Sequence, residues 1–586
     1  MSRLAHLFAL CIQFGTVPSQ WNRSLIFLLP KTTVPPITCD DVRPLSILSM
    51  FRRLFESLIL PAFVDPSKDY CKLHPSQAGF RHGYSTLTQA AVCHHAIESR
   101  SVEFIIFLDF KAAYDITLSS QVMAALKARR MPPRLQSLVF SSMFTDASYQ
   151  LVVNSVLSDS ISRNRGLPQG SPLSPIIFNL FIDSLIVELN RINSSNIPRC
   201  LFYADDGALL APDIATAKHL LCVAERWAND HGMIYNVSKC GILSIHGVPV
   251  QLTLHGLSIP IVHSYKYLGF PMTSKGIDFC QHLKNLAESS NRFLDFIQFD
   301  GHEWSPGVRW AIYRTFIRPQ MEYGAPLLKE FADMRSDHSF FDPFQSIQDR
   351  AFRWILFSNA DTPRLHQGIL GALPVSLRFT HLRCRFQLHI DQSSTQNPLR
   401  VIIHSLTALG KFVGRFRHNT LYNEFKRSKI YQEDPIRSKI TLSEYLSQHL
   451  LSLRSAHLCT LQTQLILLTY ITIDGRTRSL TDHVLNAPPA FQSEFVSWRK
   501  GVLFVNRKCP CKSLWTRRHI KCLPVVTLPP ELESLFQAEK QKQSEKFVCL
   551  DFLLNVKEWD LAHHVIDLWS KALPFQYISL WILLIS

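Results

Sequence analysis

Short apolar runs alternate with amphipathic helical patterns along the first half of the chain. Runs rich in β-branched and aromatic residues are typical of strands, whereas apolar positions recurring every three to four residues are typical of helices. Strands and helices are expected to alternate, strand first, in the segments SLIFLLP, ILSMFRRLFESLILPAF, VEFIIFLDF, SQVMAALKARR, SYQLVVNSV, PIIFNLFIDSLIVELN, CLFYADDGALLA, IATAKHLLCVAERWAND and CGILSI. The pattern predicts an α+β domain over residues 23–273.

A different pattern follows this domain. Segments such as VRWAIYRTFIRPQME and FQSIQDRAFRWILF are amphipathic with helical spacing, which predicts a helical domain over residues 274–395. Residues 1–22 are expected to form a helical extension, and residues 396–586 a basic C-terminal region. Prolines interrupt helices, and breaks are expected at Pro306, Pro319 and Pro363.

Composition excludes several classes of protein. Hydrophobic residues make up 46% of the 586 positions and charged residues 18%, so the chain can bury large cores and is not generally disordered. The 14 cysteines have irregular spacing, which favours reduced thiols over a disulfide framework. No run of 18 apolar residues occurs, and we therefore expect no membrane partner.

The positive charge is concentrated in one stretch. Of the net +16, residues 400–521 contribute +13, from 20 Lys or Arg against 7 Asp or Glu. A local positive field of this kind is typical of a nucleic-acid partner. The alternative is a solvated basic face with no partner.

Two apolar runs carry aspartates at their ends. Asp109 ends the run VEFIIFLD, and Asp205 and Asp206 lie beside Gly207 within CLFYADDGALLA, which predicts a hairpin with both carboxylates at its turn. Each of these aspartates alone is more often structural than catalytic. If the two strands are neighbours, however, the carboxylates meet, and hard divalent cations are the natural partners of such a cluster. Two Mg²⁺ ions between carboxylates would support in-line phosphoryl displacement.

Read in order, the segments resemble the reverse transcriptases of non-LTR (LINE-like) retrotransposons over roughly residues 5–395. The similar segments are FGTVPSQWNRSLIFLLPK and DDVRPLSILSMFRRLFESLI (opening region), HPSQAGFRHGYST (fingers motif), VEFIIFLDFKAAYD (motif A), NRGLPQGSPLSPIIFNLFID (motif B), LFYADD (motif C), SKCGILSI (motif D), YKYLGFPM (motif E), and FIRPQMEYGAPL with IQDRAFRWIL after them. The resemblance implies a right-hand polymerase, with fingers and palm at 23–273 and a helical thumb and connector at 274–395. It also implies RNA-directed DNA synthesis from dNTPs on template RNA with a DNA primer or target.

The resemblance assigns roles to the residues that match these motifs. Asp109, Asp205 and Asp206 would bind two Mg²⁺ ions, and Arg81 would contact the triphosphate of the nucleotide. Tyr114 matches an aromatic steric gate that excludes a 2′-hydroxyl. Without the resemblance, Arg81 would be interpreted as a surface residue and Tyr114 as a core residue.

Further roles follow from motifs B, D and E. Gln169 and Gly170 would lie near the nucleotide and template, and Lys239 would protonate the pyrophosphate leaving group. The turn at Tyr267, Leu268 and Gly269 matches a primer grip, with a simple hairpin as the alternative. Three basic residues are either phosphate contacts or solvated surface charges: Lys31, Arg43 and Arg52.

A Cys/His cluster lies at 509–522 in the basic region. Cys509, Cys511, His519 and Cys522 are spaced C-x-C-x7-H-x2-C and resemble the zinc knuckle of many non-LTR elements. Three thiolates and an imidazole suit tetrahedral Zn²⁺, but the first and last spacings are short, so unliganded cysteines are the alternative. Five neighbouring cations would make a liganded knuckle a nucleic-acid contact: Lys508, Lys512, Arg517, Arg518 and Lys521.

Complete elements of this class also carry an endonuclease. The polymerase-like segments begin close to Met1, and no Pro-Asp…Glu pattern follows Cys522, so any nicking activity is expected to come from a separate or upstream endonuclease. The resemblance implies a ribonucleoprotein of the nucleus and cytoplasm. The alternatives are an inactive nucleic-acid-binding remnant, a group II intron maturase-like reverse transcriptase, and a viral RNA polymerase. The sequence Tyr-Ala-Asp-Asp and Tyr114 disfavour the RNA polymerase, and FIRPQMEYGAPL disfavours the maturase.

Overall fold

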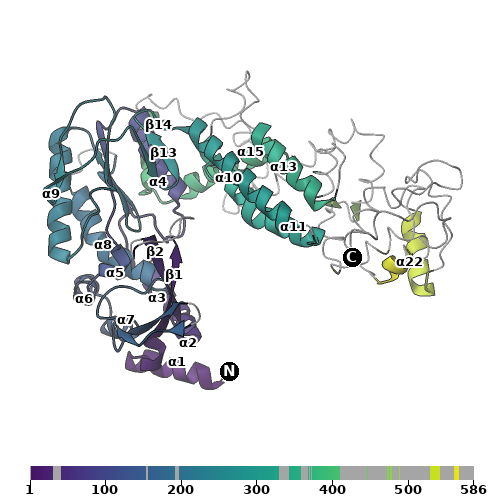
Figure 1. Ribbon diagram of the computed structural model, residues 1–586, viewed down its shortest axis with the longest axis horizontal. Helices are drawn as coiled ribbons and strands as arrows, with labels where there is room; N and C mark the ends of the chain where they lie inside the picture. Colours follow the sequence, from purple (N-terminus) through teal and green to yellow (C-terminus); the bar gives the residue numbers. More distant parts are fainter. Residues whose placement is uncertain are drawn as a thin grey trace. The chain divides into compact units, whose positions relative to one another are not determined.

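The structure is a computed structural model of the 586-residue chain (Figure 1). It describes residues 2–408 except 31–37, 39–40, 154–155, 192–196, 302, 329–341, 358–366, 368–369 and 371, and beyond these 445, 472–473, 476–477, 488, 528–541, 553 and 560–565. The chain divides into two compact units. The first consists of Met1–His282 with His389–Gly414, and the second of Leu283–Leu388 with Arg415–Ser586.

A four-stranded antiparallel sheet lies at the centre of the first unit. Its strands follow the order β7 (Cys200–Tyr203), β8 (Asp206–Ala211), β3 (Phe104–Leu108) and β9 (Gly241–Ser244). All five residues of β3 are buried, as its uninterrupted apolar run predicts. The expected strand VEFIIFLDF and the expected hairpin CLFYADDGALLA are therefore confirmed, and they are neighbours in one sheet.

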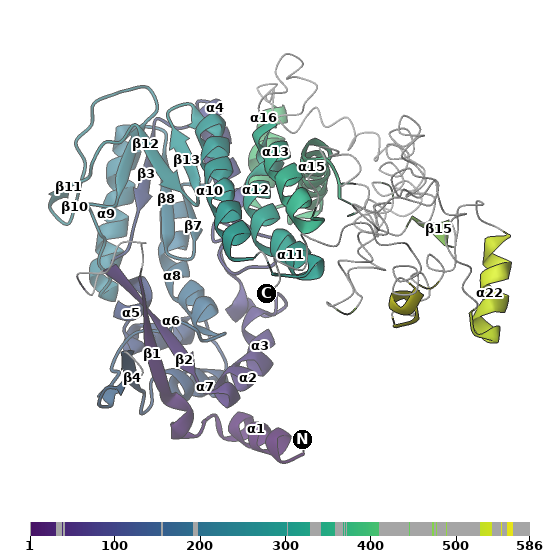
Figure 2. The same ribbon diagram turned by 45° about the vertical axis from the view of Figure 1, so that its right-hand side comes forward.

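Helices cover one face of this central sheet, and a small sheet covers the other. Phe104, Ile106 and Leu108 share the hydrophobic core with residues of α8 (Ser174–Asn190) and α9 (Ile214–His231). Side chains alternate along a strand, so Phe107 points the opposite way and stacks on Tyr265, with ring centroids 4.2 Å apart. Figure 2 shows α8 and α9 beside β3, β8 and β7.

Tyr265 belongs to a three-stranded antiparallel sheet on that second face. Its strands, in order, are β12 (Ser264–Tyr267), β13 (Phe270–Thr273) and β14 (Gly276–Ile277). Helix α4 (Thr86–Glu98) contacts β7, β14 and α16 (Pro398–Ala408). A capping box at Ser85 and Thr88 begins α4 by satisfying backbone N–H groups of its first turn.

A second sheet lies in the same unit and carries strands β1 (Arg23–Pro30) and β2 (Val42–Leu48) (Figure 2). The strands β2, β1 and β4 (Ser148–Val153) follow in that order, with β1 antiparallel to β2 and parallel to β4. Its remaining strands are β5 (Val156–Leu157) and β6 (Ile161–Ser162), which both pair with β4. The strand β1 is the expected SLIFLLP, and β4 is the expected SYQLVVNSV.

An aromatic cluster packs the N-terminal helix against this part of the unit. Phe8 of α1 (Ser2–Phe14), Trp21 and Phe55 of α2 (Met50–Ile59) lie with ring centroids 5.4 to 5.9 Å apart. The other elements of the first unit are η1 (Ser19–Asn22), α3 (Pro61–Val64), η3 (Asp69–Cys71), α5 (Ala113–Ile116), α6 (Ser119–Ala128), α7 (Pro133–Met143), β10 (Thr253–Leu254) and β11 (Leu257–Ser258).

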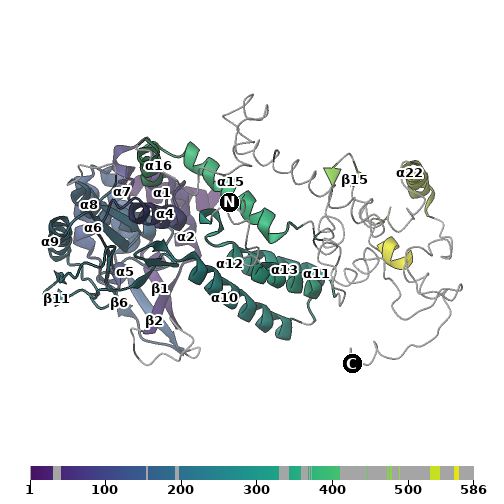
Figure 3. The ribbon, with the colours of Figure 1, turned by 90° about the horizontal axis from the view of Figure 1, so that it is seen from above.

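The second unit is helical where its core is described. Figure 3 shows α10 (Phe279–Asp300), which begins in the first unit, along α12 (Arg318–Glu322) and α13 (Asp342–Ile355). Arg378 donates two hydrogen bonds, of 2.6 and 2.9 Å, to the carboxylate of Glu322. The other elements are α11 (Pro306–Ile312), η4 (Tyr313–Ile317), η5 (Ala325–Leu327), α15 (Val375–Gln392), β15 (Thr472–Ile473), β16 (Arg476–Thr477) and α22 (Pro530–Lys540).

Two expected boundaries differ from the structure. The helix expected from Ile47 begins only at Met50, because β2 pairs with β1 as far as Leu48. Pro319 does not end its helical segment but follows a π-helical turn at Tyr313–Ile317. Proline lacks the N–H that an α-helix needs, and a local change of helical hydrogen bonding accommodates this loss. Pro363 lies outside the described residues.

Two expectations from composition can be compared with the described part of the chain. All eight cysteines described there are free thiols, as the irregular spacing predicts. No helix in that part is long and apolar enough to cross a membrane.

The aromatic cluster makes a stability prediction. Phe55 is fully buried, whereas its neighbour Leu54 on the same helix is 50% exposed. Phe55→Ala is expected to lower the free energy of unfolding by about 3–5 kcal/mol, because it leaves a cavity. Leu54→Ala is the matched control and should cost about 0.5 kcal/mol or less. Urea unfolding measures both values, and equal losses would contradict the packing described for α2.

Candidate active site

Three aspartates meet at one end of the central sheet. Asp109 follows the last residue of β3, and the antiparallel register places Leu108 opposite Gly207 of β8. Asp206 begins β8 and pairs with Tyr203, while Asp205 lies in the turn between β7 and β8. The neighbouring strands therefore bring Asp109 to the same sheet end as Asp205 and Asp206, which the sequence could predict only conditionally.

The electrostatics of these groups follow from their proximity. Burial is the largest cause that raises the pKa of Asp205, and the charge of Asp109 raises it further. Asp206 is an exposed residue as a whole, yet partial desolvation of its carboxylate raises its pKa to about 6, with the charges of Asp205 and Asp109 adding to the effect. The three groups thus repel one another in a partly desolvated place, which a cation would relieve.

The donor set fits a hard divalent cation in its chemistry. Carboxylate oxygens are the ligands that Mg²⁺ prefers, and mutual repulsion is what such an ion neutralises. In the described part of the chain, however, no group of three or more His, Cys, Asp or Glu side chains is arranged closely enough to hold a metal ion.

The backbone around Asp109 is fixed by the segment before β9. The carbonyl of Asp109 accepts a 2.7 Å hydrogen bond from the N–H of Asn236, and its own N–H lies 3.4 Å from the Sγ of Cys240. Lys239 precedes Cys240 in the same turn, is exposed, and its carbonyl accepts a hydrogen bond from the hydroxyl of Tyr265. The aspartate and the lysine are thus held by one short turn.

Tyr114 lies in the short helix α5 that follows Asp109. Its ring stacks on Phe178 with centroids 4.7 Å apart, and its hydroxyl has no hydrogen-bond partner among the described residues. Burial, followed by the charge of Asp205, raises its pKa. The side chain is thus held by ring packing rather than by its hydroxyl.

The Gln169–Gly170 loop is fastened between α5 and the second sheet. The amide of Gln169 donates to the carboxylate of Asp115, at 3.2 and 3.3 Å, and its carbonyl accepts from the N–H of Ser46 at 2.9 Å. Gly170 has φ +126°, and a Cβ there would lie 2.5 Å from the carbonyl oxygen of Ser46. Only glycine fits both the backbone conformation and the space.

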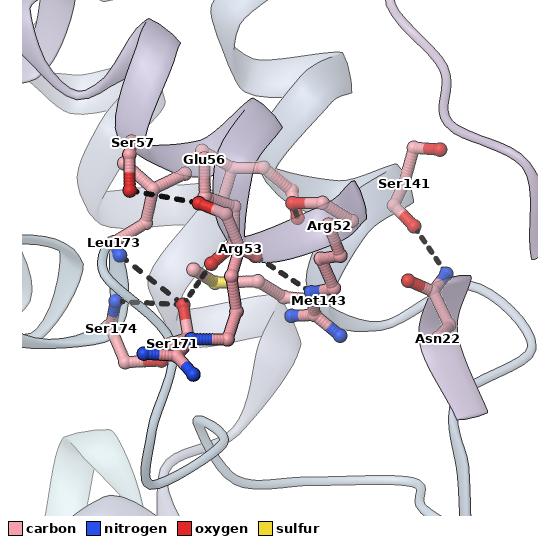
Figure 4. A network of polar contacts seen from close by, with 12 residues as sticks. Asn22, Arg52, Arg53, Glu56, Ser57, Ser141, Met143, Ser171, Leu173 and Ser174 are labelled. Atoms are coloured by element: carbon pink, nitrogen blue, oxygen red, sulfur yellow. Dashed lines mark hydrogen bonds and ion pairs between the residues drawn. The ribbon is translucent and has the colours of Figure 1, made fainter. Parts of the chain in front are cut away.

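A buried charged network holds the next residue of this loop (Figure 4). The hydroxyl of Ser171 donates to Glu56 at 2.5 Å and accepts from the N–H groups of Leu173 and Ser174, at 3.2 Å each. Arg52 donates to the other oxygen of Glu56 at 2.7 Å. Arg52 is 1% exposed, so its interpretation as a phosphate contact or a solvated surface charge is wrong. Its neighbour Glu56 stabilises its charge inside the protein instead.

Arg81 is anchored by main-chain groups of its own loop. Its guanidinium donates to the carbonyls of His74 and Gln77, at 2.8 and 2.7 Å, and lies 4.3 Å from the centre of the Tyr84 ring. Burial is the main cause that lowers its pKa. These contacts restrict the side chain to one orientation.

The segment Tyr267, Leu268 and Gly269 forms the turn of the β12–β13 hairpin. Tyr267 pairs with Phe270, and the two residues between them have φ values of +47° and +85°. Positive φ at both central positions is typical of a tight two-residue hairpin turn. Tyr267 is buried, with its ring centroid 5.2 Å from that of Phe107, so the turn is fixed to the central sheet.

Several predicted site residues lie outside the described residues. These are Lys31, the five cations near the cluster, and Cys509, Cys511, His519 and Cys522. Sequence reasoning also missed three buried polar residues around the site, Glu56, Gln77 and Gln89, and the half-buried Asp115 that accepts from Gln169. For Glu56 and Gln89 the available signal was polarity within a helical pattern, since buried polar groups need partners.

Comparison with known proteins identifies the domain that carries these residues. Residues 29–272 match the family model described as "Reverse transcriptase (RNA-dependent DNA polymerase)". This part of the chain is a reverse transcriptase domain, and the resemblance inferred from the motifs is confirmed.

The relatives come from retrotransposons. The "RNA-directed DNA polymerase from mobile element jockey" of Drosophila melanogaster is 26% identical over 340 residues, which cover 55% of this chain and 37% of the relative. The Pol polyprotein from type-1 retrotransposable element R2 of Popillia japonica is 26% identical over 260 residues, covering 41% of this chain and 42% of the relative. The chain thus spans less than half the length of these relatives.

Solved structures give a weaker likeness. The apo telomerase from Candida tropicalis is 12% identical, with a TM-score of 0.35, and the match covers 76% of this chain and 74% of that one. A likeness at this level supports no conclusion about this chain.

The loop around Gly170 makes a prediction about steric fit. Gly170→Ala should lower the free energy of unfolding by about 2 kcal/mol or more, because of backbone strain and contact with Ser46. The melting temperature should fall with it. Gly256→Ala is the matched control, because Gly256 also has positive φ but nothing within 4 Å of its Cβ position. A loss no larger than that of the control would show that the close approach to Ser46 is not a constraint.

Proposed function

We propose that this chain is the RNA-directed DNA polymerase of a non-LTR retrotransposon. The observation that carries the proposal is the convergence of Asp109, Asp205 and Asp206 at one end of the central sheet of a reverse transcriptase domain. In the reaction, the 3′-hydroxyl of a primer attacks the α-phosphate of a dNTP. The new phosphodiester bond forms as the bond to pyrophosphate breaks.

Each group has a task within a right-hand polymerase of fingers, palm and thumb. The three aspartates would hold two Mg²⁺ ions, which supply charge neutralisation at the attacking and leaving oxygens when bound. Arg81 binds phosphate oxygens, and its anchored guanidinium supports that role. Lys239 donates a proton to the leaving pyrophosphate.

The remaining residues select and hold the substrates. Tyr114 excludes a 2′-hydroxyl, supported by the stacking that fixes its ring. Gln169 and Gly170 contact the nucleotide and template, and the Tyr267–Gly269 turn holds the primer end.

The basic C-terminal region binds template RNA or target DNA. Its Cys509, Cys511, His519 and Cys522 hold Zn²⁺ as a nucleic-acid-binding knuckle. A separate endonuclease nicks the target, and the chain works in a ribonucleoprotein in the cytoplasm and nucleus.

Loss of a carboxylate is the first test of the proposal. Asp205→Asn should abolish Mg²⁺-dependent dNTP incorporation on a primed RNA template, with a fall of about a thousandfold or more, because an essential ligand charge is lost. Asp230→Asn is the control, since Asp230 is exposed at the end of α9 and should leave incorporation unchanged. A folded wild-type chain that binds RNA but incorporates nothing would favour an inactive remnant.

Sugar selection gives a second test. Tyr114→Ala should reduce the preference for dNTPs over rNTPs on the order of tenfold or more, because the ring that blocks the 2′-hydroxyl is removed. Tyr114→Phe should keep both the preference and the stability, since the hydroxyl has no hydrogen-bond partner to lose among the described residues. Competition between dGTP and GTP on the same template measures the ratio. An unchanged ratio in Tyr114→Ala would rule Tyr114 out as the gate.

A further inference from the structure

The turn that carries Asp205 has an unusual backbone conformation. Ala204, the residue before Asp205, has φ +57° and is 5% exposed. A non-glycine residue in this left-handed region costs about 1–2 kcal/mol, and such strain persists only where the surroundings hold it. The turn at Ala204 therefore needs a specific partner that holds it.

The holding group is the side chain of Gln77. Its Oε1 accepts a 2.9 Å hydrogen bond from the N–H of Ala204, and its Nε2 donates to the carbonyl of Ala204 at 3.1 Å. One carboxamide thus satisfies both backbone groups of the strained residue. Gln77 is completely buried, so no solvent competes for these bonds.

The backbone around Gln77 continues the central sheet toward this turn. The N–H of Phe202 donates to the carbonyl of Ser76 at 2.9 Å, and the N–H of Ala78 donates to the carbonyl of Phe202 at 2.8 Å. Gln77 therefore forms an isolated parallel bridge with Phe202 of β7. Beyond the end of β7, the side chain of Gln77 makes the hydrogen bonds to the backbone of Ala204 that a neighbouring strand would otherwise make.

The position of Gln77 is itself fixed from two sides. Its Oε1 also accepts from the N–H of Gly79 at 2.9 Å, and a Cβ on Gly79 would lie 2.3 Å from the nitrogen of Ala204. Asn179 of α8 donates to the carbonyl of Gly79 at 2.7 Å. The loop can approach the turn this closely only because residue 79 has no side chain.

We propose that Gln77 is a positioning residue for catalysis, fixing the Ala204–Asp205 turn so that the carboxylates of Asp205 and Asp206 face Asp109. The inference rests on the proposed polymerase function. Partners that orient metal-binding side chains typically contribute ten- to hundredfold to metal affinity or activity. The main-chain carbonyl of Gln77 also anchors Arg81, but a side-chain substitution leaves that contact in place.

Gln89 offers a matched control, because its side chain binds the backbone of the same two segments. It is a buried glutamine of α4, and its amide donates to the carbonyls of Ser76 and Phe202 at 2.8 Å each. It therefore supports the strand next to the turn without touching Ala204. Gln77→Met and Gln89→Met remove equivalent amides, but only the first frees the turn.

The experiment compares these variants of the full chain in steady-state dNTP incorporation. Gln77→Met should lower kcat on the order of tenfold to a hundredfold and raise the half-saturating Mg²⁺ concentration about tenfold, with the dNTP KM changed about twofold or less. Gln89→Met should leave the Mg²⁺ dependence unchanged. If both variants lose the same fraction of kcat at an unchanged Mg²⁺ requirement, Gln77 only stabilises the backbone next to the turn, and the proposal is wrong.

Hydrogen exchange gives a readout that does not require activity. The amide of Ala204 should exchange faster in Gln77→Met than in the wild type, and at the wild-type rate in Gln89→Met. If Gln77→Met does not fold, Gln77→Asn replaces it, because its shorter amide falls one methylene short of Ala204, and the same order is expected. A wild-type chain without polymerase activity would overturn the proposed function. An unchanged exchange rate at Ala204 in Gln77→Met would instead overturn the proposal that Gln77 fixes the turn.

Discussion

The arrangement of the site depends on one constraint, the antiparallel pairing of β3 with β8. The register that sets Leu108 opposite Gly207 brings three carboxylates to one sheet end, where they repel one another. This repulsion costs free energy that the buried core on both faces of the sheet must offset. The apolar packing of the central sheet therefore maintains an arrangement of charges that the charges alone would not adopt.

Buried polar contacts complete what apolar packing cannot specify. Hydrophobic contacts are non-directional, but a strained turn or a glycine loop needs directional partners. The carboxamide of Gln77 supplies them at Ala204, and Glu56 supplies them at Ser171. Both partners come from segments preceding α4, so the first hundred residues orient loops that arrive later in the chain.

Much of this fold could be predicted from the sequence, because the central elements have strong local patterns. The uninterrupted run of β3, the hairpin at Asp205 and Asp206, and the helices α8 and α9 all lie where periodicity predicts them. The hydrogen bonds that hold the Ala204 turn could not be predicted, because Gln77 and Ala204 are 127 positions apart and only tertiary structure joins them. Arg52 was misjudged for the same reason, since burial by other elements is invisible in a local pattern. The roles of Arg81, Lys239 and the hairpin turn at Leu268 remain proposals.

The first unit is discontinuous along the chain, and this has a consequence for its synthesis. Its second segment, His389–Gly414, contains α16, which packs against α4. Leu399 and Ile402 of α16 are fully buried, and the ring of His389 is hydrogen bonded to the carbonyl of Gly83. A nascent chain that has emerged only as far as residue 282 therefore holds every strand of the central sheet but lacks the helix that covers α4. The unit reaches its final packing only after more than a hundred further residues have left the ribosome. Until then the face of α4 that α16 covers lacks its partner, so completion of the domain depends on translation of the residues between its two segments.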